Sequence, residues 1–116
     1  MYDPVSVYTV TADENGSSNA IISALSNSTG ILVHKVILEN TTNGSNVVSV
    51  AINDHQTIGS SATLIRLSTS SHGGAGADAY QRYAVETFRP PVPMQFGVSI
   101  NVTGNGASAT IHYTRR

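Results

Sequence analysis

The sequence predicts an all-β domain, an antiparallel two-sheet sandwich of jelly-roll-like type with seven or eight strands. Short segments rich in Val, Ile, Leu, Thr and Tyr recur along the chain, separated by clusters of Gly, Asn, Ser and Pro. Charged residues make up only 11% of the chain and Lys35 is its one lysine, whereas exposed helices usually carry many Lys, Glu and Arg residues. No long helical segments alternate with the strands, which excludes a βαβ fold.

In the N-terminal half, Val5–Thr11 alternates between apolar and polar residues, as a half-buried strand does. Ala20–Leu25 is a short apolar segment that fits either a strand or a single helical turn. Gly30–Glu39 is apolar on both faces except for one histidine and one lysine, which predicts burial on both sides or cover from a neighbouring subunit. Val48–Asn53 alternates again after an Asn-Gly turn, so these last two segments are predicted to form a hairpin.

In the C-terminal half, Ala62–Leu67 is a further predicted strand, and the Gly- and Ser-rich residues 68–78 are predicted to form a flexible loop. Ala79–Phe88 fits a strand or an amphipathic helical turn. Arg89–Pro93 contains three prolines, which cannot donate amide hydrogens, so this segment cannot join a sheet interior and we expect an extended polyproline-like connector. Val98–Tyr113 alternates on both sides of a Gly-Asn-Gly turn and predicts a C-terminal hairpin.

Length and composition predict a single domain over residues 1–116, with an N-terminal arm over residues 1–6. The net charge is −1 and no basic patch is evident, which disfavours nucleic acid as a partner. No apolar run is long enough to cross a bilayer, and the N-terminus resembles no signal peptide, so we expect a chain made in a cytoplasm with no membrane partner. Cysteine is absent, so stability must come from the core or from a partner subunit.

Catalytic and metal-binding patterns are weak, so we expect no enzyme activity, no metal and no cofactor. The four histidines His34, His55, His72 and His112 show no H-x-H or H-x-x-x-H spacing. Asn53-Asp54-His55 could belong to a catalytic dyad, but no nucleophile motif accompanies it. The acidic loop residues Asp13, Glu14 and Asp54 lack the spacing of an EF-hand calcium loop.

Two segments resemble known proteins. Phe96–Tyr113, a strand, a T-G-x-G-A turn and a final strand ending in Tyr, is similar to the closing hairpin of small virion proteins from tailed phages, and the Pro-rich lead-in Arg89–Pro93 is similar too. Gly30–Ile52 resembles the same group. The resemblance implies a capsid decoration (cement) protein, a small β-sandwich in the virion that self-associates, with a trimer favoured, and binds the major capsid protein.

Two alternatives stay open, a host-receptor or glycan-binding module of a tail fibre or spike, and a neck or tail connector protein. The Tyr80, Tyr83 and Phe88 aromatic cluster and the Gly-rich loop motivate the glycan alternative, because aromatic rings stack on sugars, but a core or interface role is favoured for the cluster itself. The candidate interface residues come from the arm, from the apolar strand and from this aromatic cluster. They are Tyr2, Val5, Ile31, Val33, Lys35, Ile37, Tyr80, Tyr83 and Phe88.

Overall fold

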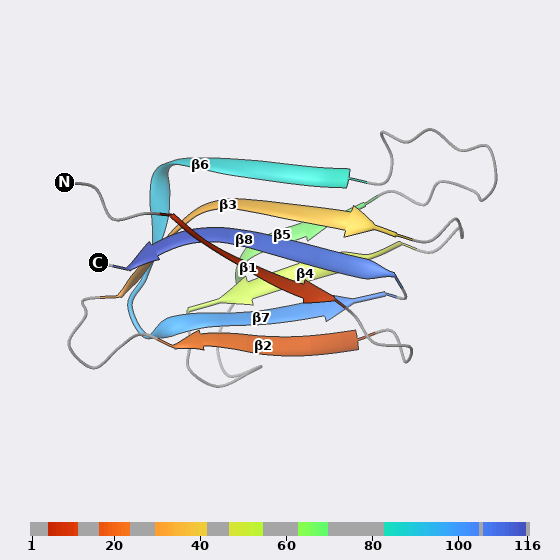
Figure 1. The fold of residues 1–116 in the computed structure, drawn as a ribbon, viewed down its shortest axis with the longest axis horizontal. Coiled ribbons are helices and arrows are strands. Elements are labelled where there is room, and N and C mark those ends of the chain that lie inside the picture. Colours follow the sequence, from red (N-terminus) through yellow and green to blue (C-terminus); the bar gives the residue numbers. More distant parts are fainter. Residues whose placement is uncertain are drawn as a thin grey trace.

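The computed structural model describes residues 5–11, 17–23, 30–41, 47–54, 63–69, 83–104 and 106–115 (Figure 1). Eight strands and no helix occur within these residues. The strands are β1 (Ser6–Thr11), β2 (Ser17–Ser23), β3 (Ile31–Asn40), β4 (Ser49–Asn53), β5 (Thr63–Ser68), β6 (Tyr83–Met94), β7 (Gly97–Thr103) and β8 (Ala107–Arg115). The described part of the chain contains no helix that could span a membrane.

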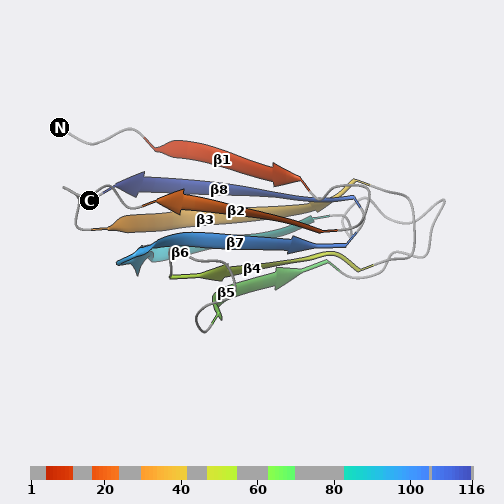
Figure 2. The same cartoon turned by 90° about the horizontal axis from the view of Figure 1, so that it is seen from below.

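The strands form two four-stranded sheets, which pack face to face (Figures 1 and 2). The first sheet has the order β1-β8-β3-β6 and the second sheet has the order β2-β7-β4-β5, and every neighbouring pair is antiparallel. The first strand therefore pairs with the last, the second with the seventh, the third with the sixth and the fourth with the fifth. This nested pairing is that of an eight-stranded jelly roll, so the predicted fold class is confirmed.

The core lies between the sheets and is built from alternate residues of each strand. On β3 the buried apolar residues are Ile31, Val33, Val36 and Leu38, each with no exposed surface. Branched side chains suit this position because they pack well on a pleated surface. The remaining fully buried large side chains are Val48, Val50, Ile52, Met94, Val98, Ile100, Val102 and Ile111.

The described parts of both segments left open between strand and helix form strands, since residues 20–23 belong to β2 and residues 83–88 belong to β6. The expected connector at Arg89–Pro93 is wrong, because these residues belong to β6. β6 is the last strand of the first sheet and pairs only with β3 within the described residues. An edge strand needs amide donors on one side only, so it tolerates prolines that a central strand would not. The Arg89–Pro90 peptide bond is cis.

Neither predicted hairpin forms. β7 and β8 lie in different sheets, and so do β3 and β4. The turn between β7 and β8 passes from one sheet to the other at the end of the sandwich, where the amide of Ala107 donates to the carbonyl oxygen of Gly104 at 3.0 Å. Gly104 has a φ of +110°, and a Cβ there would lie 2.8 Å from Cγ1 of Val48, so glycine suits both the backbone and the space.

Two irregularities face each other in the first sheet. On β3, the pairing with β8 steps from Val33↔Tyr113 to Lys35↔His112, so His34 is an extra residue and forms a β-bulge. On β6, the pairing with β3 steps from Val92 to Thr87, so residues 88–91 lie opposite the same bulge. The bulge reverses the alternation of β3, because Ile31 and Val33 face the core before it and Val36 and Leu38 face the core after it.

Candidate functional site

The outer face of the first sheet carries large apolar side chains that solvent reaches. Val7 on β1 is 57% exposed, and Tyr83 and Val85 on β6 are each 51% exposed. Ile37 on β3 lies directly opposite Val85 and is partly exposed. We call these four residues the apolar face. The Tyr83 hydroxyl donates to Oε1 of Glu39 at 3.3 Å, which holds the aromatic ring over the neighbouring strand.

The outer face of the second sheet is more polar. Asn101 on β7 donates from Nδ2 to Oδ1 of Asn19 on β2 at 2.7 Å, and Thr103 donates from Oγ1 to Oδ1 of Asn101 at 3.0 Å. On the described strands of this sheet, the half-exposed large apolar residue is Leu64, at 55%. Exposed apolar side chains that gather on one face mark a contact surface more often than scattered ones do. The first sheet is therefore the better candidate for an interface.

Four of the sequence-predicted interface residues lie on or beside this outer face, namely Val5, Lys35, Ile37 and Tyr83. The assignment of Ile31 and Val33 to an interface is corrected, because both have no exposed surface and belong to the core. All four residues chosen on this strand would share one face if the alternation were unbroken, but the His34 bulge places the first two inside and the last two outside.

The aromatic cluster does not assemble. Tyr83 points to the outer face, whereas Phe88 packs against the core between the sheets. Tyr80 and Tyr2 lie outside the described residues, as do residues 1–4 of the predicted arm and residues 70–78 of the predicted loop. Ser6 is the first residue of β1, so the end of the arm is a paired strand.

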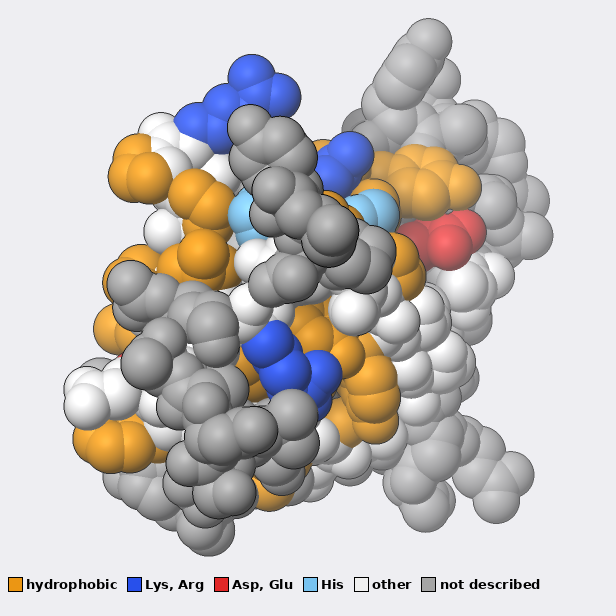
Figure 3. Space-filling model, turned by 60° about the vertical axis from the view of Figure 1, so that its left-hand side comes forward, with side chains coloured by type: hydrophobic (Ala, Val, Ile, Leu, Met, Phe, Trp, Pro, Cys, Tyr) orange, Lys and Arg blue, Asp and Glu red, His pale blue; other side chains and the backbone are white. Residues whose placement is uncertain are grey.

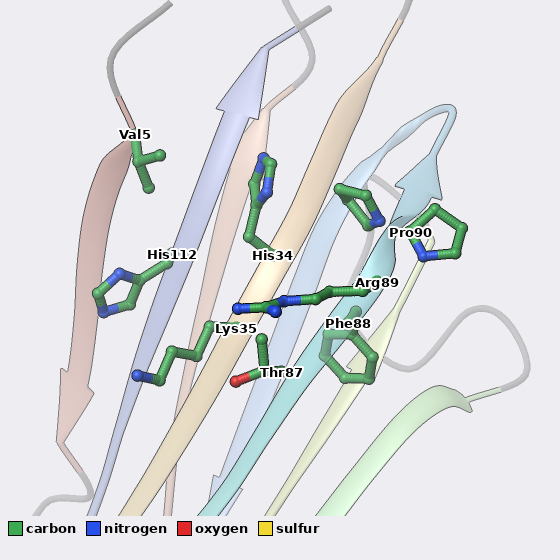
Figure 4. Close-up of a pocket in the computed structure, with 9 residues that line it drawn as sticks. Val5, His34, Lys35, Thr87, Phe88, Arg89, Pro90 and His112 are labelled. Atoms are coloured by element: carbon green, nitrogen blue, oxygen red, sulfur yellow. The ribbon is translucent and has the colours of Figure 1, made fainter.

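A hollow of about 500 Å³ opens on the outer face at the paired irregularities (Figure 4). It is lined by side chains from β3, β6 and β8 and by Val5 just before β1. Arg89 extends from β6 toward β3, and Lys35 extends from β3 toward His112 on β8 (Figure 4). Histidine and basic side chains lie among hydrophobic ones on this part of the surface (Figure 3). The lining residues are Val5, His34, Lys35, Thr87, Phe88, Arg89, Pro90, Pro91 and His112.

Hydrogen bonds hold part of this hollow in place. Nε2 of His34 lies 2.8 Å from Oγ1 of Thr114 on β8, so the imidazole is tied to the neighbouring strand. Of these outer-face residues, Lys35 was predicted from the sequence, whereas Val7, Val85 and Arg89 were not. The two valines could have been predicted, because their strands carry apolar residues at both odd and even positions, and this pattern predicts that both faces of a strand are buried. Arg89 gave no signal, because the Pro-rich segment was interpreted as a connector.

The other residues considered for catalysis or metal binding either have a structural role or lie outside the described residues. Asp54 follows β4, and its two carboxylate oxygens accept the amides of Gln95 at 2.9 Å and Phe96 at 2.8 Å. It therefore anchors the turn between β6 and β7. The described residues contain no group of three or more His, Asp or Glu side chains arranged to hold a metal ion. His55, His72, Asp13 and Glu14 lie outside the described residues.

No family model matches the chain, and no curated protein matches it. Among solved structures, it is similar to a protein of the Bacillus endospore appendages, described as disulfide-linked pili, with a TM-score of 0.45 and 16% identity over 96% of this chain and 85% of that one. It is similar to a protein of infectious bursal disease virus, strain Gx, with a TM-score of 0.37 and 13% identity. That match covers 96% of this chain and 32% of the viral one.

A third similar structure is the tobacco streak virus coat protein, with a TM-score of 0.34 and 8% identity over 93% of this chain and 85% of the coat protein. Likeness at this level assigns no function to the chain. What the described residues define is a cysteine-free jelly-roll domain with an apolar outer face on one sheet and a basic hollow beside it.

Proposed function

We propose that this chain is a structural protein of a virus particle, namely a capsid decoration (cement) protein of a tailed phage. It self-associates and stabilises the shell by binding the major capsid protein, and it carries out no catalysis. The observation that carries the proposal is the apolar face, Val7, Ile37, Tyr83 and Val85, on the outer side of one sheet. A second chain that covered these side chains would remove them from water, which is the main driving force of association.

Two further points support a role in assembly. Jelly rolls serve in viral capsids and lectins, although a fold alone does not define a function. The segments that resemble phage virion proteins form β3, β4, β7 and β8, which supply much of the core of this jelly roll. We favour a trimer, since small decoration proteins of this kind often form trimers.

The apolar face sets the expected strength of association. Burying a whole Val, Leu or Ile side chain stabilises by about 1.5–3 kcal/mol, so a half-exposed one contributes about 1 kcal/mol. The three half-exposed residues and the partly exposed Ile37 together contribute about 3–4 kcal/mol per subunit. This is close to the lower estimate of what association costs in lost freedom. Contacts beyond the apolar face are therefore needed for a stable complex, and a capsid lattice would supply them through many repeated copies.

The test is the solution mass of the purified protein, measured by light scattering, alone and with tailless capsids that lack it. An oligomer that co-sediments with the capsids at a fixed ratio and raises their resistance to heat supports the proposal. A monodisperse monomer that leaves the capsids unchanged contradicts it, because neither self-association nor shell binding would remain.

A host-receptor or glycan-binding module of a tail fibre is the second candidate. The hollow lined by Lys35 and Arg89 favours it, since binding sites for small molecules are concave and carry a few converging polar groups. The aromatic residues that first suggested glycans do not act together here, because Phe88 lines the hollow whereas Tyr83 does not. Binding of the protein to host cells in the absence of capsids would favour this candidate over the first.

A further inference from the structure

The hollow on the outer face of the first sheet concentrates positive charge. Lys35 and Arg89 line it, and these two are half of the four Lys and Arg residues that the structure describes. The imidazoles of His34 and His112 line it as well. These four nitrogen-bearing side chains come from three adjacent strands, so residues far apart in the sequence converge on one depression (Figure 4).

The three described carboxylates lie elsewhere. Glu39 accepts the hydroxyl of Tyr83, and Asp54 accepts two amides at the turn between β6 and β7. Glu86 lines a separate, smaller hollow of about 280 Å³ together with Arg66. Within the described lining, no acidic side chain compensates the charge of Lys35 and Arg89. An anion that entered the hollow would therefore meet attraction on several sides.

The backbone departs from regular pairing at this one place on both sides of β3. The bulge puts the consecutive residues His34 and Lys35 on the same face, and the unpaired stretch of β6 carries Arg89 over that face. Bulges re-aim side chains and are common beside binding sites. The convergence of basic groups therefore follows from the local backbone and not from a chance clustering on a regular strand.

Size and lining indicate the class of ligand. A volume of about 500 Å³ lies within the range of small-molecule sites and far exceeds the needs of a single inorganic anion. Val5, Pro90 and Pro91 offer apolar surface to an organic body, and Thr87 offers a hydroxyl. We infer that the hollow binds an anionic saccharide, a sugar ring that carries a phosphate, sulfate or carboxylate group.

In this assignment the anionic group lies between Lys35 and Arg89. The guanidinium of Arg89 can donate two parallel hydrogen bonds to one oxyanion, and the ammonium of Lys35 supplies a point charge. The ring hydroxyls meet Thr87 and the two imidazoles, and the carbon face of the ring packs on the prolines. Val7 of the apolar face pairs with His112, which lines the hollow, so the hollow adjoins the apolar face and its binding is tested on the purified protein without capsids.

The test is titration of the purified protein at low ionic strength with four ligands, namely glucose 6-phosphate, glucuronic acid, glucose and inorganic phosphate. Binding is measured by calorimetry and by changes in the NMR signals of the histidine rings. Glucose 6-phosphate and glucuronic acid should each bind at least about tenfold more tightly than glucose, since bonds to charged groups are the strong ones. Glucose 6-phosphate should also bind more tightly than inorganic phosphate. Equal affinity for glucose, or for inorganic phosphate, overturns the assignment of an anionic saccharide.

Three variants test the location. Arg89→Ala and Lys35→Ala should each weaken binding of glucose 6-phosphate about tenfold, because each removes one charged donor. Arg66→Ala is the matched control, since it removes the same charge from an exposed position on β5 outside this hollow, and it should bind like the unaltered protein. A thermal unfolding curve for each variant separates loss of binding from loss of fold. If Arg66→Ala weakens binding as much as Arg89→Ala, the attraction is a property of net charge and the site is refuted.

Discussion

Replacement of Val85 by Asp should weaken self-association strongly and leave the fold intact. Val85 is 51% exposed on the edge strand β6 and lies directly opposite Ile37, two residues along the strand from Tyr83 of the apolar face. A half-exposed valine contributes about 1 kcal/mol when a partner covers it. A carboxylate buried there without a partner adds a cost of about 1–3 kcal/mol. The expected loss of about 2–4 kcal/mol corresponds to a dissociation constant raised about 30- to 1,000-fold.

The assay is sedimentation velocity over a concentration series, and Leu64→Asp is the matched control. Leu64 is 55% exposed on β5 of the second sheet, so this variant introduces the same charge at a similar exposure on the other side of the sandwich. It should associate as the unaltered protein does. If both variants associate equally well, or if Leu64→Asp dissociates the oligomer and Val85→Asp does not, the apolar face is not the interface and the reasoning fails.

Three stability predictions follow from the fold, each measured as the midpoint of urea unfolding. Asp54→Ala should destabilise by about 1–3 kcal/mol because two amides lose their acceptor, and Asp54→Asn should cost less since one oxygen remains. Ile111→Ala should cost about 2–5 kcal/mol because the side chain is fully buried, whereas Val7→Ala on the exposed face should change stability by less than about 0.5 kcal/mol. Gly104→Ala should cost about 1–3 kcal/mol through its positive φ and the contact with Val48, and stability equal to that of the unaltered protein would contradict the strained turn.

On β7 and β8, alternation was a sound guide to which apolar residues face the core. Val98, Ile100 and Val102 on β7 and Ala107, Ala109 and Ile111 on β8 are all buried, as the pattern of the last segment predicted. The period of two follows from the geometry of a single strand, and any strand with one buried face shows it. Local sequence therefore carries this information without reference to the partner strand.

Strand partners could not be read from the same pattern. A strand pair that alternates on both sides of a short Gly-rich turn satisfies the core equally well as a hairpin in one sheet or as two strands in facing sheets. In this jelly roll the second arrangement holds for β3 with β4 and for β7 with β8. What decides between them is the pairing of β8 with β1, between residues about a hundred positions apart, and no local signal reports it.

The basic hollow lay beyond the sequence for a related reason. A strand interrupted by His34 and Lys35 could be a regular strand with a polar patch or a strand with a bulge, and only the register with β8 distinguishes the two. The prolines after Phe88 likewise indicated that regular strand pairing is interrupted there, but they did not show which residues of β3 lie opposite the interruption. The bulge on β3 and the interruption on β6 lie opposite each other in the sheet. The bulge therefore places Lys35 on the same outer face as Arg89, and both side chains line the hollow. Strand propensity and the period of two predict irregular positions poorly, and these positions bring the charged side chains together on this face.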